Sequence, residues 1–263
     1  MKFGGASMAT PEHINRVAQI IENKKKCYKK LIVVVSAMGK TTDDLINLAL
    51  KVHPNPPKRE LDMLISVGER ISMSLLAMAL MQLGIKAISF TGSQSGIITN
   101  ENHSEAKIVC VKPQRIEKAL EAEQVVIVAG FQGVSRKGEI TTLGRGGSDT
   151  TAVALGVALA ASKVEFYKDV DGIYSSDPKM SHDSFLYSFL SYQDALEIIY
   201  KGAKILHARC VELAAKNDMI LHVLSFNDPE GLLSNGTKIA NQPNEENKIK
   251  NKKGLSACYE EVF

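Results

Sequence analysis

Short runs of β-branched apolar residues alternate with longer helical patterns along this chain of 263 residues. The first half contains three strand-like runs and three helical stretches, which are Leu31–Val35, Asp43–Val52, Lys58–Leu83, Ile85–Phe90, Lys112–Glu121 and Val125–Ala129. Strands that alternate with helices are typical of parallel sheets with crossover connections. The runs LIVVV and VVIVA are continuously apolar, so both faces of the sheet should be covered. We therefore expect an α/β fold, a three-layer αβα sandwich with a mainly parallel central sheet.

The second half repeats this alternation without an internal sequence repeat. Its expected elements are a helix over Ser148–Ala161, a strand over Lys163–Tyr167, helices near Tyr192–Tyr200 and His207–Asn217, and a strand over Ile220–Ser225. From Asn241 onward the composition shifts to Asn, Glu and Lys, which is typical of a linker. We expect one compact domain over residues 1–240 and a linker over 241–263.

Composition excludes several classes of function. The net charge is +3, aromatic residues make up 6% of the chain and Trp is absent, so a nucleic-acid-binding surface is not expected. The densest basic run, from Lys24 to Lys30, is expected to be a solvated helix end. The apolar stretch Thr151–Ala161 is too short to cross a bilayer, and the N-terminus has no apolar signal core.

The four cysteines, Cys27, Cys110, Cys210 and Cys258, lie far apart, with no C-x-x-C pair and no histidine spacing that suggests zinc. Such usage favours a reduced, cytoplasmic compartment. No protein ligand for a metal ion is assigned from the sequence.

A glycine pair near the N-terminus is the first candidate site. Lys2-Phe3-Gly4-Gly5 ends a short strand, and Thr10-Pro11 begin a helical pattern. Adjacent glycines let backbone N–H groups approach an anion closely, and a neighbouring lysine supplies a positive charge. A glycine pair alone is usually only a turn, and the spacing is not that of a P-loop.

A stronger signal is the segment Thr141–Asp149, which holds three glycines and Arg145 and leads into a helix. Ser148 and Asp149 are good N-cap residues, and a helix start behind glycines binds anions readily. Arg145 could hold a carboxylate through two hydrogen bonds. We favour ligand binding over a purely structural loop here.

Glu69 lies inside a long apolar helical pattern without a cation three or four residues away. Such a carboxylate must find a partner elsewhere in the fold or stay in water. A solvent-facing Glu on an amphipathic helix explains the periodicity equally well, so both interpretations stay open.

Two further polar segments follow. The loop Lys168–Lys179 comes directly after a strand, where open α/β sheets bind ligands, and it lacks the spacing and terminal Glu of a calcium loop. Lys204 follows a predicted helix end, where a lone lysine ordinarily interacts with the helix dipole.

Taken in order, these segments resemble the aspartokinases, members of the amino-acid kinase fold. The resemblance runs from Lys2 to about Ile239 and is carried by KFGG, VVVSAMGKTTDDL, KRELDMLISVGERIS, TTLGRGGSDTTA, KDVDGIYSSDP and GAKILH. Each motif alone is modest, but their joint order and spacing are specific. The resemblance implies transfer of a phosphoryl group from ATP, with Mg²⁺, to the side-chain carboxylate of L-aspartate, the first step toward lysine, threonine and methionine.

The same resemblance implies roles for individual residues. Lys2, Lys204 and Asp149 would be catalytic, with the lysines stabilising the transferring phosphoryl group and Asp149 holding them in position. The residues implied in aspartate binding are Thr42, Glu69, Arg145 and Ser148. The residues implied in ATP binding are Lys2, Phe3, Gly4, Gly5, Lys168, Asp169, Tyr174, Asp177, Lys179 and Lys204. It also implies a substrate lobe over about 1–135, a nucleotide lobe over about 136–240, and allows a homodimer.

Some positions depart from the family pattern. Only Met1 precedes Lys2, so the first strand is expected to be short, and Ala6 stands where a hydroxyl residue is common. Lys253–Ala257 resembles the lead-in to a regulatory ACT domain that is missing or truncated here. Two alternatives remain, namely another amino-acid kinase, of the glutamate 5-kinase or acetylglutamate kinase type, and a non-catalytic nucleotide-binding regulator of the same fold.

Overall fold

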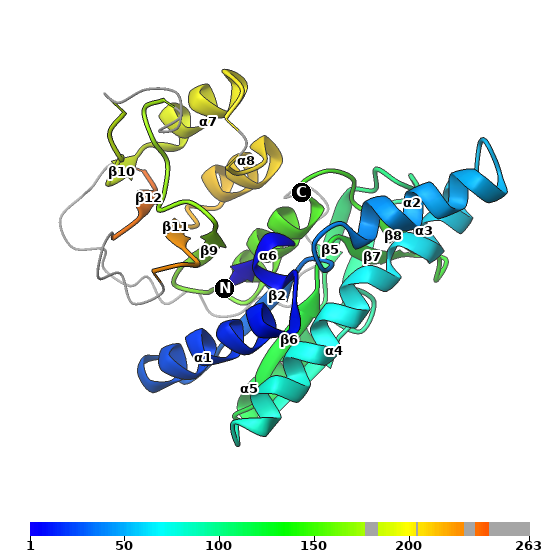
Figure 1. Ribbon diagram of the computed structural model, residues 1–263, viewed down its shortest axis with the longest axis horizontal. Helices are drawn as coiled ribbons and strands as arrows, with labels where there is room; N and C mark the ends of the chain where they lie inside the picture. Colours follow the sequence, from blue (N-terminus) through cyan, green and yellow to red (C-terminus); the bar gives the residue numbers. More distant parts are fainter. Residues whose placement is uncertain (177–183, 204, 229–234, 242–263) are drawn as a thin grey trace.

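A mainly parallel central sheet organises the protein (Figure 1). The computed structural model describes residues 1–176, 184–203, 205–228 and 235–241. Within these residues, eight strands form one sheet in the order β10-β12-β11-β9-β1-β2-β6-β3. In that order the strands are Phe189–Leu190, Thr237–Ile239, Leu221–Ser225, Val164–Lys168, Lys2–Phe3, Ile32–Val35, Val125–Ala129 and Ala87–Phe90.

The strand pairs at the centre of this sheet are all parallel, and among the described strands of the sheet only β11 and β12 pair antiparallel. Every residue of β6 is buried, as its unbroken apolar sequence predicted. β1 has only two residues, as expected, and it lies between the longer strands β2 and β9.

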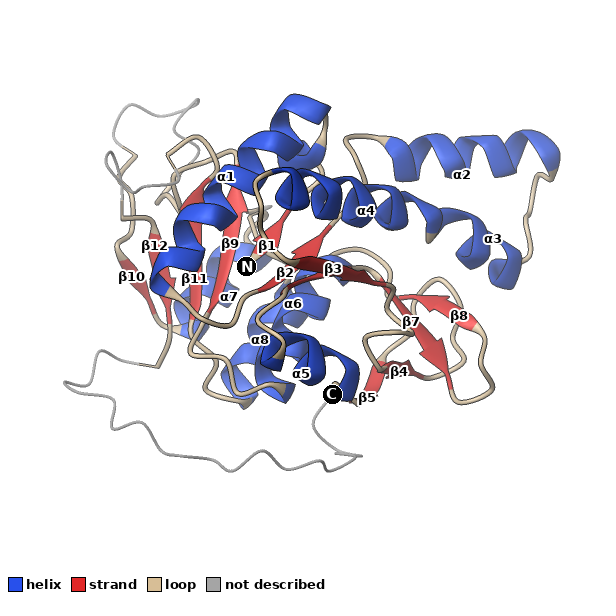
Figure 2. Cartoon of the chain, turned by 90° about the horizontal axis from the view of Figure 1, so that it is seen from below, coloured by secondary structure: helices blue, strands red, loops and turns tan. Residues whose placement is uncertain are grey.

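Helices cover both faces of the sheet (Figure 2). On one face lie α1 (Pro11–Cys27) and α4 (Val67–Gln82), which share a buried cluster with Val33, Val35 and Ile127. On the other face lie α5 (Gln114–Glu121), α6 (Gly147–Ala158), α7 (Tyr192–Tyr200) and α8 (Ala208–Lys216). The predicted three-layer αβα sandwich is therefore confirmed.

A second, smaller sheet lies at one end of the molecule and was not predicted. Among the described residues it has four strands in the order β5-β4-β7-β8, which are Ile108–Val111, Ile97–Thr99, Gln132–Ser135 and Ile140–Thr142. Helices α2 (Thr41–Val52) and α3 (Lys58–Ile65) lie at the same end (Figures 1 and 2).

The helix predicted over Lys58–Leu83 is two helices, α3 and α4, which meet at Ser66. The Ser66 hydroxyl donates to the carbonyl of Met63, and the Ser66 carbonyl accepts a hydrogen bond from Gln132 Nε2 at 2.8 Å. These contacts to side chains satisfy polar groups at the junction. Residues 58–82 are apolar enough to cross a membrane by length and composition, but 56% of the tested window is buried inside the protein, as in a core helix.

The basic run at the end of α1 is only partly solvated. Lys26, Lys29 and Lys30 are exposed as expected, whereas Lys24 is half-buried and pairs with the buried carboxylate of Glu165 at 3.0 Å. The expectation of a fully solvated helix end was therefore wrong at Lys24, because helix α1 packs across the sheet and brings this lysine to β9.

Candidate active site

The carboxyl ends of three neighbouring strands, β1, β2 and β9, meet at one edge of the sheet. Phe3 at the end of β1 lies opposite Val35 on one side and Tyr167 on the other. Ligands of open α/β sheets bind outside the carboxyl ends of the strands. The residues at this edge are therefore the first candidates for a functional site.

Three charged side chains from distant segments meet here. Lys2 Nζ lies 2.6 Å from Asp149 Oδ1, and Lys168 Nζ lies 3.5 Å from Asp149 Oδ2. Asp149 is in the first turn of α6, where the helix dipole favours a negative charge. All three side chains are less than one-fifth exposed, so a buried carboxylate holds two ammonium groups at this edge.

Burial and charge act against each other in this cluster. Burial acts to raise the pKa of Asp149, but the charges of Lys2 and Lys168 outweigh it, so the pKa lies below its ordinary value. Burial lowers the pKa of Lys168, and the nearby charge of Lys2 adds to this effect. Asp149 is therefore an anion that keeps two cations close together.

Glu69 is buried at the same edge, with 3% of its surface exposed. Its Oε1 accepts a hydrogen bond from the backbone N–H of Ala37, which follows β2, at 3.2 Å, and its Oε2 has no partner among the described residues. Burial raises the pKa of Glu69 to about 7, partly opposed by backbone hydrogen bonds and by the charge of Lys2. The solvent-facing alternative for Glu69 is therefore excluded.

The glycine pair lies directly beside these charges. A side-chain carbon built onto Gly4 would lie 3.7 Å from Lys2 Nζ, and one built onto Gly5 would lie 3.1 Å from the carbonyl oxygen of Gly39. The Lys2 ammonium group therefore lies over the glycine turn. A larger residue at Gly5 would press against the backbone that follows β2.

The predicted loop before α6 runs along the same edge. Arg145 is exposed and has no ion pair or hydrogen bond within the described part of the chain. Ser148 is buried and packs on the end of β6, since a side-chain carbon at Gly130 would lie 2.7 Å from Ser148 Cβ. The structure thus brings Ser148 and Asp149 to the sheet edge and leaves the Arg145 side chain available.

Gly146 precedes α6 in the left-handed conformation, with φ at +71°. A side-chain carbon at this position would lie 2.3 Å from the Cβ of His207, which precedes α8. Only glycine therefore satisfies both the backbone conformation and the close approach of the two helix starts.

Replacing Gly146 with alanine should lower the free energy of unfolding by more than the ~1–2 kcal/mol that a left-handed alanine costs. Gly138→Ala is the matched control, because the φ of Gly138 is +85° and a side-chain carbon at that position would meet nothing within 4 Å. Chemical denaturation of both variants isolates the clash with His207. Equal losses of stability would show that the contact with His207 has no energetic consequence.

Two predicted site residues, Phe3 and Thr42, are wholly or partly buried. Phe3 is fully buried and stacks on Tyr167 with ring centroids 4.7 Å apart, so its side chain cannot contact a nucleotide. Thr42 is half-buried in the first turn of α2. Its neighbour Thr41 lies 3.6 Å from a side-chain carbon built onto Gly68, so the start of α2 is close to the residue before Glu69.

The loop after β9 is described only in part. Asp169 is exposed, and the half-buried Tyr174 donates a hydrogen bond to Asp171 at 3.3 Å. Asp177, Lys179 and Lys204 lie outside the described residues, and so does the predicted linker beyond Asn241.

The described residues contain no group of three or more His, Cys, Asp or Glu side chains that could hold a metal ion. The buried carboxylate of Asp149 is already paired with two lysines. The donor set of the described residues therefore does not form a site for a resident Mg²⁺ ion.

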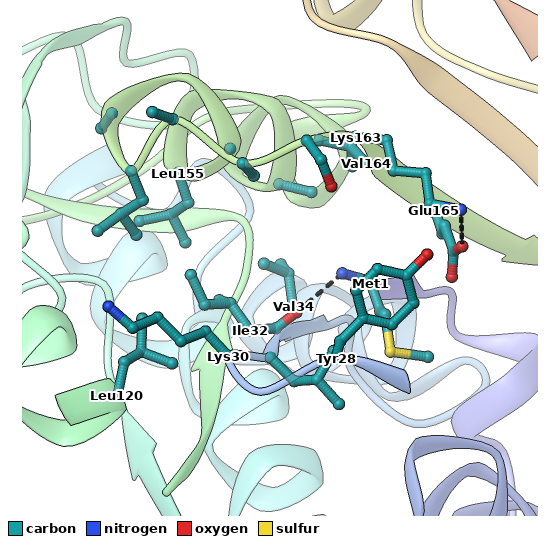
Figure 3. Close-up of a pocket in the computed structure, with 18 of the residues that line it drawn as sticks. Met1, Tyr28, Lys30, Ile32, Val34, Leu120, Leu155, Lys163, Val164 and Glu165 are labelled. Carbon is teal, nitrogen blue, oxygen red and sulfur yellow. Dashed lines mark hydrogen bonds and ion pairs between the residues drawn. The ribbon is translucent and has the colours of Figure 1, made fainter. Parts of the chain in front are cut away.

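A cavity of about 500 Å³ lies at the opposite edge of the sheet, at the amino ends of β1, β2 and β9 (Figure 3). Met1, Ile32, Val164 and Glu165 are among the residues that line it, and the Met1 ammonium group donates to the carbonyl of Ile32 at 2.8 Å. Lys2, Glu69 and Asp149 do not line this cavity. It is separate from the charged cluster at the carboxyl ends.

Three contributions to the site were missed from the sequence. The backbone N–H of Ala37 donates to Glu69, Gly130 leaves room for Ser148, and the side chain of His207 packs on Gly146. A backbone donor and a residue that is needed only for its small size carry no chemical signal in a single sequence. His207 belongs to the motif GAKILH, so its motif was recognised but its contact with Gly146 was not.

Comparisons with known proteins find aspartokinases among the similar sequences and structures. The aspartokinase of Mycolicibacterium smegmatis is 50% identical over 238 residues, which is 90% of this chain and 56% of that protein. The crystal structure of aspartate kinase from Synechocystis has a TM-score of 0.81 at 42% identity and covers 94% of this chain and 40% of its own. Aspartokinase III of E. coli, solved in complex with aspartate and ADP, has a TM-score of 0.82 at 28% identity and covers 94% of this chain and 64% of its own.

The chain thus spans a little over half the length of the curated relatives it matches. The family model described as "Amino acid kinase family" matches residues 1–225, which include every described residue of the charged cluster. On this match and on its fold, the chain belongs to the amino acid kinase family.

Proposed function

We propose that this chain is the catalytic region of an aspartate kinase, which transfers the γ-phosphoryl group of ATP to the side-chain carboxylate of L-aspartate. The observation that carries the proposal is the buried carboxylate of Glu69, whose Oε2 has no partner in the described part of the chain and lies at the ligand-binding edge of the sheet. A substrate ammonium group would satisfy this oxygen and restore the pairing that a buried charge requires. The identity of about 50% to aspartokinases supports the same conclusion.

The substrate is held at its two α-substituents. Glu69 takes the ammonium group, and Arg145, which is exposed and unpaired within the described residues, takes the α-carboxylate through two hydrogen bonds. Ser148 and Thr42 add hydrogen bonds from the starts of α6 and α2. The side-chain carboxylate of aspartate then remains free to face the nucleotide.

Phosphoryl transfer needs no general base, because the attacking carboxylate is already ionised. A bond forms between one carboxylate oxygen and the γ-phosphorus, the bond from this phosphorus to the β,γ-bridging oxygen breaks, and ADP leaves with the electron pair. Two like charges ~4 Å apart repel by about 4 kcal/mol at an effective dielectric constant of ~20. Lys2 offsets this repulsion, and Asp149 positions Lys2 together with Lys168.

The nucleotide binds along the glycine turn and the loop after β9. Gly4 and Gly5 offer backbone donors beside Lys2, while Lys168, Asp169 and Tyr174 lie on the β9 side. The resemblance adds Lys204, Asp177 and Lys179 from outside the described residues. The nucleotide would bind as its Mg²⁺ complex, in which the metal ion would neutralise part of the phosphate charge.

The direct test is to incubate the chain with MgATP, hydroxylamine and either L-aspartate or L-glutamate, and to measure the hydroxamate. We expect product with aspartate only. Product with glutamate but not aspartate would favour a glutamate-type kinase. Nucleotide binding by calorimetry without turnover at saturating aspartate would favour a non-catalytic regulator.

Aspartate binding should weaken as the pH falls below 7. The pKa of Glu69 in the free protein is raised to about 7 by burial, and only the ionised carboxylate attracts the substrate ammonium group. The dissociation constant for aspartate should therefore rise about tenfold for each pH unit below the pKa and level off above it. Calorimetric titrations between about pH 5.5 and 8.5 test this, and a flat profile would contradict the role of Glu69.

The biological setting is proposed from the same resemblance. We place the reaction at the start of lysine, threonine and methionine biosynthesis in the cytoplasm, with a substrate lobe over about 1–135, a nucleotide lobe over about 136–240 and a homodimer as the assembly to test. Cys27, Cys110 and Cys210, the cysteines within the described residues, form no disulfide, which supports a reducing compartment.

A further inference from the structure

Asp62, in α3, is a fully buried carboxylate that the proposed reaction does not use. Its two oxygens accept hydrogen bonds from His103 Nδ1 at 2.8 Å, from the backbone N–H of Ser104 at 3.0 Å, and from both the N–H and the hydroxyl of Thr142 at 3.2 and 2.6 Å. A buried carboxylate is stable only when it is hydrogen-bonded in this way. Asp62 therefore joins three segments, namely α3, the loop over 100–106 and the end of β8.

Two of these segments support the loop over residues 143–146, which carries Arg145 and is called the Arg145 loop here. Thr142 is the last residue of β8, and this loop begins directly after it. The backbone N–H of Ala106 donates to the Thr142 carbonyl at 2.8 Å, and the Ser104 carbonyl oxygen lies 3.2 Å from a side-chain carbon built onto Gly144. The backbone that leads into Arg145 is thus held at Thr142 and beside Gly144 by residues that Asp62 anchors.

The third segment leads to Glu69. Helix α3 ends at Ile65, and α4 begins at Val67 with Glu69 in its first turn. The junction at Ser66 is itself tied to β7 by the hydrogen bond from Gln132 Nε2. Any shift of α3 at Asp62 would therefore move the start of the helix that holds Glu69.

Ser104 gives independent evidence that this arrangement is constrained. Its φ is +68°, a left-handed conformation that is unfavourable for a residue other than glycine. Such a conformation persists only where the surroundings determine it. Here the N–H of Ser104 is held by both oxygens of Asp62.

We propose that Asp62 is a positioning residue that fixes the Arg145 loop relative to the helix that carries Glu69. It thereby sets the separation of the positive and negative groups that receive the α-carboxylate and the ammonium group of an amino-acid substrate. This inference rests on the proposed function for the identity of the substrate, but the connection between Asp62 and the loop can be measured without turnover.

The first test is Asp62→Asn, which keeps the shape of the side chain and removes its charge. We expect the KM for aspartate to rise about 10- to 100-fold, because a small misplacement of binding groups has effects of this size. The KM for ATP should change less than about twofold, because neither Lys2 nor the glycine turn contacts Asp62.

Glu165→Gln is the matched control. Glu165 is also a buried carboxylate with several partners, namely Lys24, Lys163 and Tyr167, but it lies at the opposite edge of the sheet. The Glu165→Gln variant should have a lower melting temperature and an unchanged KM for aspartate. If the KM for aspartate rises equally in Asp62→Asn and Glu165→Gln, the effect is caused by general destabilisation. That result would overturn the proposal.

Thr142 supplies a milder variant that tests the same connection. Thr142→Ser keeps the hydroxyl that donates to Asp62 Oδ1 and should retain the KM for aspartate. Thr142→Val has nearly the same shape without the hydroxyl and should raise the KM in the same direction as Asp62→Asn. A wild-type KM in the valine variant would contradict the proposal.

Hydrogen exchange separates this inference from the proposed function. In Asp62→Asn, the amides of residues 143–147 should exchange faster, while those of β9 and β11 should be unchanged. If the wild-type chain does not phosphorylate aspartate, the proposed function fails and faster exchange still supports the positioning role. If exchange over 143–147 is unchanged, the positioning role is wrong even where aspartate is phosphorylated.

Discussion

Lys2→Ala is expected to lower kcat for aspartate phosphorylation by about 100- to 1000-fold, the range observed when one group that stabilises transition-state charge is removed. Lys2 Nζ is 2.6 Å from Asp149 Oδ1 and lies over the glycine turn, whereas Lys168 approaches the other oxygen of Asp149 at 3.5 Å. The KM for aspartate should change much less than kcat, because charge develops on the phosphoryl group only during transfer. Steady-state kinetics at saturating MgATP measure both constants.

The same substitution also affects stability, because it removes one of the two described partners of the buried carboxylate of Asp149. Lys168 remains 3.5 Å from Asp149, so the loss should stay below the ~3 kcal/mol that is typical when a buried pair is broken completely. Lys24→Ala is the matched control, since Lys24 is half-buried and pairs with Glu165 at the opposite edge. A fall in kcat of similar size in Lys24→Ala would remove the catalytic assignment of Lys2.

Glu69→Gln is expected to raise the KM for aspartate by about 10- to 100-fold and to change kcat little. A hydrogen bond to a charged group contributes about 1.5–3 kcal/mol, and this variant keeps the shape of the side chain while removing its charge. The variant should also lose the weakening of aspartate binding below pH 7 that is expected for the wild-type protein, because the titrating group is gone. Kinetics with varied aspartate on either side of this pKa, at about pH 6 and pH 8, measure both effects.

Glu60→Gln is the control for a carboxylate on the neighbouring helix, because Glu60 is exposed and its ion pair in the described part of the chain is with Arg59. It should leave the KM and its pH dependence unchanged. If Glu69→Gln has a wild-type KM for aspartate, the ammonium group binds elsewhere and the substrate site must be reassigned.

The layered architecture was predictable because it depends on local patterns. The continuous apolar runs of β2 and β6 became central parallel strands, and the predicted start of α6 was correct to within one residue. The N-cap prediction for Ser148 and Asp149 was wrong, because both lie inside the first turn and the N-cap is Gly146. Periodicity reports which residues are buried, and burial on both faces is what distinguishes a parallel sheet from a half-exposed one.

The small sheet was missed because its strands carry little local signal. β4 and β8 have three residues each, and β7 contains a glycine and a glutamine. Short strands of this kind are stabilised by their partners and not by their own propensity. The break at Ser66 was missed for a similar reason, since the Gln132 side chain that binds there comes from that sheet.

The sequence by itself determined the fold class, the family resemblance and the chemical types at the site, because residue identity and spacing carry them. Only the tertiary structure decided whether Glu69 was buried or solvated and which described lysines share Asp149. It also decided that Asp62 connects α3, which leads to Glu69, with the end of β8, which leads to Arg145. The physical reason is that desolvation and pairing depend on which distant groups come within a few ångströms, and helical spacing is equally compatible with either environment.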